Sequence, residues 1–229
     1  MDTQPPMLSL RGLSVGWGPR CVLPQLQLEV NAGEVLCVVG PGGSGKSTLL
    51  RALEAIILDA PPDPQNLWWR GEVDVSVETC RRLNQHGSFA RDRISELLAV
   101  EELSWLLEAS ERDVLQTNLD RSLAAVPDHL RRVLSFALVA REPAPLLLFD
   151  EPIFSLPEPW SAQITAGLRA LASRGKTLIV VTHYLPLARE IGDRVALLID
   201  GALIESGPTE DFFCRARHPR TRRFLQWGT

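Results

Sequence analysis

Residues 40–48 read Gly40-Pro41-Gly42-Gly43-Ser44-Gly45-Lys46-Ser47-Thr48. They match the pattern GxxxxGK[ST], which surrounds phosphate groups when it lies between a strand and a helix. Both flanks meet this requirement. Val35–Val39 is a short β-branched run typical of a buried strand, and apolar residues recur at helical spacing from Ser47 to Leu58. The sequence therefore predicts a phosphate-binding loop between this strand and a helix over Ser47–Leu58.

The residue types of this loop suit the binding of a nucleoside triphosphate. Glycines let successive backbone N–H groups face the phosphate oxygens, and the following helix adds the positive end of its dipole. Lys46 supplies a point charge for the β- and γ-phosphates, and Ser47 supplies a hydroxyl for Mg²⁺. We therefore expect the whole loop, from Gly40 to Thr48, to bind ATP together with Mg²⁺.

A second buried run, Leu146–Phe149, is followed directly by the carboxylates Asp150 and Glu151. Parallel strands present their functional groups at the carboxyl edge of a sheet, where the phosphate loop also lies. Asp150 is expected to hold the Mg²⁺ shell, partly through water, and Glu151 to act as a general base on the attacking water. An acidic pair at a strand end could also be a solvated turn, but its position downstream of a phosphate loop favours catalysis.

The rest of the chain predicts an α/β fold. Two more strands and two more helices are expected, at Thr177–Val181, Val195–Ile199, His129–Ala140 and Ser161–Ser173. Strands that alternate with helices form a mostly parallel sheet covered by helices. The segment Ile94–Leu123 reads as helical throughout and interrupts this alternation, as a small helical lobe would.

Composition narrows the class further. The chain has 229 residues, of which 45% are apolar and 23% charged, enough for one domain with a small inserted lobe. The net charge of −4 gives no general attraction to nucleic acid, so no nucleic-acid partner is expected. The N-terminus lacks a signal-peptide pattern, no apolar run is long enough to cross a bilayer, and the four cysteines lack zinc-site spacing. These features predict a cytosolic protein with reduced thiols.

The phosphate loop and the strand LLLFDEP together resemble the nucleotide-binding subunits of ATP-binding cassette (ABC) transporters, over nearly the whole chain. The resemblance implies a P-loop NTPase with a mostly parallel sheet core, an N-terminal antiparallel β part and a short helical subdomain. It implies a single domain over residues 1–229, with the helical subdomain at approximately residues 86–140 inserted in a RecA-like core. It also implies ATP hydrolysis coupled to transport, on the inner face of the cell membrane, with transmembrane permease subunits as partners.

The family pattern gives roles to three more residues. His183 would contact the γ-phosphate and join Glu151 and Lys46 as a catalytic residue, although a lone histidine is more often structural. Trp17 would stack on adenine, or else serve only in core packing. Gln85 would reach Mg²⁺ at the entry to the helical lobe and relay contact with the membrane subunits.

Within the family, the chain resembles importers of phosphate or polar amino acids. The resemblance rests on Gly71-Glu72-Val73 and on the tail segment Glu205–Phe213. It does not identify a substrate.

The chain departs from the family at the LSGGQ signature, which closes over the ATP of the opposite subunit in a head-to-tail dimer. Alignment through Arg131-Arg132-Val133 places Ala125-Val126-Pro127-Asp128-His129 at this position, and no glycine occurs between Gly87 and Gly167. Pro127 lacks an N–H donor, and Asp128 would bring negative charge toward the partner's phosphates. The loop after Glu151 departs as well, since Ile153–Pro157 lacks the usual terminal aspartate.

A homodimer would place this altered signature over both ATP molecules. We therefore expect a heterodimer in which a second ABC ATPase with an intact signature completes one competent site. An alternative is a regulatory module that binds ATP with little or no hydrolysis. A soluble ABC protein of translation or DNA repair is disfavoured, because such proteins usually carry two cassettes or long inserted arms.

Overall fold

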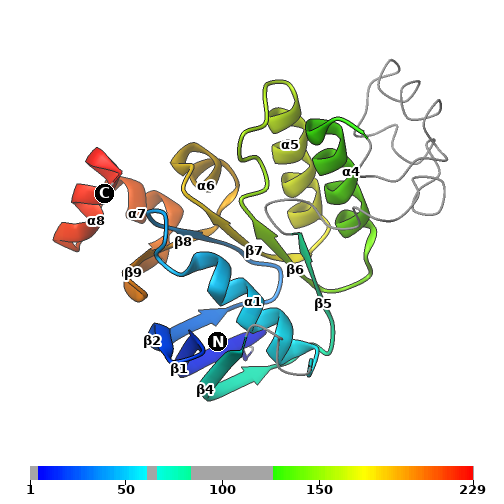
Figure 1. Cartoon of the computed structure of the whole chain (residues 1–229). Coiled ribbons are helices and arrows are strands. Elements are labelled where there is room, and N and C mark those ends of the chain that lie inside the picture. The colour runs from blue at the N-terminus through cyan, green and yellow to red at the C-terminus, as the bar shows by residue number, and fades with distance from the viewer. Residues whose placement is uncertain (1–4, 61–65, 84–125, 229) are drawn as a thin grey trace.

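The computed structural model describes residues 5–60, 66–83 and 126–228. Gln85, Ala125 and the predicted helical lobe at Ile94–Leu123 lie outside these residues. The described part of the chain contains two sheets and six helices, whose arrangement is shown in Figure 1.

The smaller sheet is antiparallel, with strand order β2-β1-β4. Its strands are β1 (Leu8–Trp17), β2 (Arg20–Val30) and β4 (Leu67–Val75). It is the N-terminal antiparallel part that the family resemblance implied.

The larger sheet has the order β5-β6-β7-β3-β8-β9. Its strands are β3 (Val35–Val39), β5 (Cys80–Leu83), β6 (Leu146–Asp150), β7 (Thr177–Thr182), β8 (Arg194–Ile199) and β9 (Ala202–Pro208). All neighbours from β5 to β8 are parallel, and β9 pairs with β8 as an antiparallel edge strand. The chain turns between β8 and β9 at Asp200 and Gly201, as predicted.

Six helices cover these strands. They are α1 (Lys46–Ile57), α4 (Asp128–Arg141), α5 (Trp160–Ser173), α6 (Leu185–Ile191), α7 (Thr209–Cys214) and α8 (Pro219–Trp227). The strands and helices predicted within the described residues all form, and each begins and ends within one residue of its predicted bounds. The mostly parallel α/β core is therefore confirmed, whereas the sequence pattern did not predict the short edge strand β5.

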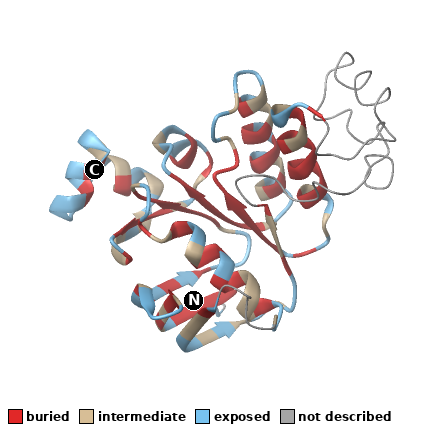
Figure 2. Cartoon of the chain, viewed as in Figure 1, coloured by how far each residue is buried: buried red, intermediate tan, exposed pale blue. Residues whose placement is uncertain are grey.

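The alternation of side chains along β3 explains the layers. Leu36 and Val38 point toward a core shared with α1 and the antiparallel sheet, whereas Val35, Cys37 and Val39 point toward a core shared with α4, α5 and α6. Both faces of β3 are thus covered, which is why its sequence is continuously apolar. Figure 2 shows the buried residues concentrated on the sheets and on the helix faces that pack against them.

The six helices of the described part of the chain are short, between 6 and 14 residues. No helix there is both long enough and apolar enough to cross a bilayer.

Candidate functional site

The phosphate loop lies where the sequence predicted it, between the end of β3 and the start of α1. Two of its glycines are required by close packing. A Cβ atom on Gly40 would lie 2.0 Å from the carbonyl oxygen of Leu198, and one on Gly45 would lie 2.6 Å from a methyl carbon of Leu23. Gly45 also has a φ of 101°, which side chains disfavour. The loop is therefore held firmly against β8 and β2 at these two points.

The middle of the loop is open. Cβ atoms on Gly42 and Gly43 would meet no heavy atom within 4 Å. Ser44 is 2% exposed, and its hydroxyl has no hydrogen-bond partner among the described residues. An unpartnered buried hydroxyl beside an open, glycine-lined turn suits a ligand that brings hydrogen-bond acceptors, such as a phosphate group.

Lys46 closes the loop from within. Its Nζ donates hydrogen bonds to the carbonyl oxygens of Gly40 (2.8 Å) and Pro41 (2.9 Å). Burial lowers the pKa of Lys46, and the nearby carboxylates of Glu151 and Asp150 oppose this shift. An ammonium group has three donors, so this geometry leaves capacity for one further acceptor.

Asp150 reaches the loop from the end of β6. The Ser47 hydroxyl donates to its Oδ1 at 2.9 Å. Burial raises the pKa of Asp150, although the hydrogen bond from Ser47 and the charge of Arg82 act in the opposite direction. A hydroxyl and a carboxylate in contact form a small set of hard oxygen donors, which suits Mg²⁺.

Glu151, the next residue, is held by several hydrogen bonds. Its Oε1 accepts from the backbone N–H of His183 at 3.0 Å and lies 2.8 Å from His183 Nδ1. Its Oε2 accepts from the Thr182 hydroxyl at 3.0 Å. The φ of Glu151 is 49°, a left-handed conformation that is uncommon for a residue with a side chain. The ring of Phe154 meets the His183 ring edge-on, with centroids 5.5 Å apart.

These groups share one cavity of about 850 Å³. All residues of the phosphate loop line it, together with Trp17, Glu151 and His183. The cavity therefore collects the predicted phosphate, base and aromatic residues, except for Asp150, which meets the loop through Ser47, and Gln85, which lies outside the described residues.

Trp17 ends β1 at the rim of this cavity. Its Nε1 donates to the Thr48 hydroxyl at 3.3 Å, and the guanidinium of Arg51 lies 5.6 Å from the centre of its ring. The residue is half-buried; it bonds to the start of α1 and lines the cavity. Thr48 and Arg51 sit on α1, and no sequence motif pointed to Arg51 as the neighbour of this ring.

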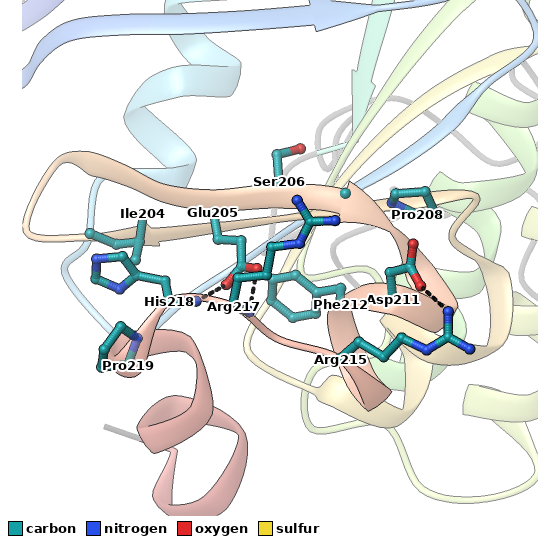
Figure 3. Close-up of a pocket in the computed structure, with 11 residues that line it drawn as sticks. Ile204, Glu205, Ser206, Pro208, Asp211, Phe212, Arg215, Arg217, His218 and Pro219 are labelled. Atoms are coloured by element: carbon teal, nitrogen blue, oxygen red, sulfur yellow. Dashed lines mark hydrogen bonds and ion pairs between the residues drawn. The ribbon is translucent and has the colours of Figure 1, made fainter.

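The C-terminal helix forms another wall that sequence reasoning missed. Phe224 on α8 and Gly228 at its end line the nucleotide cavity. Figure 3 shows a separate cavity of about 470 Å³ beside the start of α8, where Glu205 on β9 accepts hydrogen bonds from the N–H groups of Arg217 (2.8 Å) and His218 (3.1 Å), the two residues that precede the helix. No local sequence signal reveals such a contact, because it depends on how the last helix packs against β9.

The start of α4 occupies the position aligned with the family signature. The helix begins at Asp128, with Pro127 as its N-terminal cap residue. Asp128 forms an ion pair with Arg131, and the His129 ring lies 4.9 Å from that of Trp160. Pairing with Arg131 reduces the charge repulsion that the sequence alignment led us to expect from Asp128.

The comparisons with known proteins agree with this geometry. The model of the ABC transporter family matches residues 23–154, which include the phosphate loop and both carboxylates. The chain belongs to the ABC transporter family. Like other ATP-binding subunits of the family, it is an ATPase.

Relatives of this ABC ATPase match it over nearly its full length. A probable anion import ATP-binding protein of Haloferax volcanii is 31% identical, and the alignment covers 96% of this chain and 86% of that protein. A phosphate import ATP-binding protein of Natronomonas pharaonis is 30% identical, covering 95% and 86%. An L-cystine import ATP-binding protein of Bacillus subtilis is 28% identical, covering 96% and 97%.

The solved structure of an ATP-binding subunit of an ABC transporter aligns with a TM-score of 0.71. It covers 96% of this chain and 99% of its own, at 18% identity. This likeness supports the ABC-type fold alone.

The packing of the loop leads to a first prediction. Gly40→Ala should lower the free energy of unfolding by about 1–3 kcal/mol, because the added Cβ would push the loop away from β8. Gly42→Ala is the matched control, since its Cβ would meet open space. It should change the free energy of unfolding by less than about 0.5 kcal/mol. Urea denaturation of both variants measures the difference, and equal stabilities would contradict the loop geometry.

Proposed function

We propose that this chain is the ATP-hydrolysing subunit of an ABC importer, bound at the cytoplasmic face of a membrane to permease subunits on other chains. The observation that carries this proposal is the convergence of Lys46, Glu151 and His183 on one cavity. The relatives named above are import ATP-binding proteins, which supports the direction of transport. Their cargoes are an anion, phosphate and L-cystine, so the proposal extends to small polar or anionic solutes as a class.

In the proposed reaction, the chain's residues bind the nucleotide and handle one proton. Trp17 stacks on the adenine, while Lys46 and the loop N–H groups bind the β- and γ-phosphates. Glu151 accepts a proton from the water that attacks the γ-phosphorus, and the bond to the ADP oxygen breaks. Its carboxylate oxygens keep acceptor capacity beyond the bonds from Thr182 and His183. His183 orients Glu151 and contacts the γ-phosphate.

Mg²⁺ fits the donors at the loop. Ser47 and Asp150 would hold it. We propose Gln85, which lies outside the described residues, as a further ligand. When bound, the ion neutralises negative charge that develops on the phosphates. Among the described residues, no cluster of three or more His, Cys, Asp or Glu side chains could hold a metal by itself. Mg²⁺ in nucleotide sites commonly has few protein ligands, because phosphate oxygens and water supply the rest.

The metal proposal is tested by nucleotide affinity with and without Mg²⁺. Asp150→Asn removes a charged ligand, so it should abolish most of the gain in ATP affinity that Mg²⁺ gives, a loss of about ten-fold or more. Affinity without Mg²⁺ should stay close to that of the wild type. Ser173→Ala is the control, because that exposed hydroxyl donates to the Arg169 carbonyl oxygen and does not line the cavity. An unchanged Mg²⁺ dependence in Asp150→Asn would exclude this ligand set.

We further propose that the competent ATP site forms between this chain and a different ABC ATPase. The sequence alignment puts Pro127 and Asp128, which the structure has at the start of α4, at the signature position, where a partner's γ-phosphate would need glycine and serine donors. This chain's own loop, Glu151 and His183 are complete by comparison. A partner with an intact LSGGQ signature would therefore complete the site on this chain, while its own nucleotide would meet the altered helix start.

Reconstitution with a partner ATPase and its permease tests the pairing. The chain alone should hydrolyse ATP at least about a hundred-fold more slowly than the complete assembly, because the donors of the signature are missing. Within the assembly, Glu151→Gln should abolish most turnover, whereas the matching substitution in the partner should have little effect. Ordinary transporter rates from an ATP-dependent homodimer of this chain would contradict the proposal.

The altered signature also favours a second candidate, an ATP-binding regulatory module with little hydrolysis. The reconstituted assembly separates the two. A regulatory module would give the same low turnover with Glu151 and with Gln at this position, while still responding to ATP.

A further inference from the structure

Arg132 is a buried cation that contacts the catalytic turn. It lies on α4, shortly after the helix start, and is only 7% exposed. Its Nη2 donates a hydrogen bond to the carbonyl oxygen of Glu151 at 3.1 Å, and its Nη1 donates to that of Phe154. One planar guanidinium thus bridges two carbonyl groups of the turn that follows β6.

This turn needs outside support because of its backbone conformation. Glu151 is left-handed, with a φ of 49°, although it has a Cβ atom. Such a conformation persists only where several contacts fix it. The Glu151 N–H donates to the Val181 carbonyl oxygen at 2.9 Å, so β7 holds one side of the residue. Its carbonyl group points the other way, toward Arg132 on α4.

The carboxylate of Glu151 inherits its direction from this backbone. Its oxygens meet Thr182 and His183 at 2.8–3.0 Å, which requires the Cα–Cβ bond to point toward the end of β7. If the backbone relaxed to a right-handed conformation, the side chain would leave this position. A contact that fixes the peptide group after Glu151 therefore also fixes the direction of the Glu151 carboxylate.

We infer that Arg132 is a positioning residue that fixes the Glu151 turn from α4 and thereby aims the catalytic carboxylate. The inference rests on the proposed role of Glu151 as general base. Arg132 does not line the nucleotide cavity, so it acts on the site through the turn and through its charge near Glu151. Because α4 begins at the position of the family signature, Arg132 also connects the surface proposed to face the partner's nucleotide with this chain's own base.

Arg131 provides a matched control. It is the preceding residue of the same helix and carries the same charge, but its guanidinium pairs with Asp128 at the helix start. Arg131→Met therefore removes an arginine from α4 without removing a bond to the turn.

The first test is hydrogen exchange on the isolated chain. The N–H groups of Glu151, Phe154 and Leu156 are hydrogen-bonded within or beside the turn. In Arg132→Met they should exchange at least about ten-fold faster, while the amides of α5 in the same variant exchange as in the wild type. In Arg131→Met the amides of the turn should also exchange at the wild-type rate. Exchange at the wild-type rate in Arg132→Met would overturn the inference. If this variant does not fold, Arg132→Lys serves instead, since lysine keeps the charge but lacks the planar pair of Nη donors with which the guanidinium reaches the two carbonyl groups.

The second test is turnover in the reconstituted assembly. Arg132→Met should lower kcat about ten-fold or more with the KM for ATP changed less than two-fold, because the base is misplaced while binding is intact. Added guanidinium ion should restore part of the lost activity. Equal changes in kcat and KM without guanidinium rescue would indicate a merely structural arginine. A wild-type assembly without Glu151-dependent turnover would refute the proposed function, and hydrogen exchange would still decide whether Arg132 holds the turn.

Discussion

The hydrogen bond from the Ser47 hydroxyl to Asp150 Oδ1 (2.9 Å) joins two segments that are far apart in the sequence. It forms because β3 and β6 run in the same direction in one sheet, so the loop after β3 and the carboxylate that ends β6 reach the same edge. Strand β7 lies between them and delivers His183 to that edge. A shift in the register of the β6–β7 or the β7–β3 pair would move Asp150, His183 or the phosphate loop away from the others. The candidate site therefore depends on parallel strand pairing as much as on its local motifs.

This arrangement brings together buried charged groups and a left-handed backbone, each of which lowers the stability of the free chain. Burial lowers the pKa of Lys46 and raises that of Asp150, so each group is less stable in its charged form than it would be in water. Glu151 adds a left-handed backbone. A ligand that brings both phosphate charge and a metal ion would offset the burial of both charged groups, and free energy from binding would then stabilise the fold. Buried charges that lower the stability of the free chain are therefore suited to a site that binds a nucleotide.

Much of the fold followed from short-range patterns. The phosphate loop, the buried run that ends in Asp150, and the helical spacing after Ser47 each carry their own signal, and their contacts follow from the sheet edge. Other parts depend on contacts between distant segments, so no local pattern could reveal them. These are the edge strand β5, the wall formed by Phe224 on α8, and the bond from Arg132 to the catalytic turn. The left-handed conformation of Glu151 was equally hidden, because glutamate rarely adopts it.

The most direct test of the account is calorimetric titration of Mg-ATP into the chain, in comparison with Lys46→Ala. We expect one ATP per chain, and at least about ten-fold weaker binding in the variant, since a charged donor to the phosphates is lost. Lys176→Ala is the control, because Lys176 likewise donates to backbone carbonyl oxygens, those of Glu142, Pro143 and Ala144, but lies outside the cavity. Its affinity for ATP should match the wild type. Absence of binding by the wild-type chain, or undiminished binding by Lys46→Ala, would contradict the account.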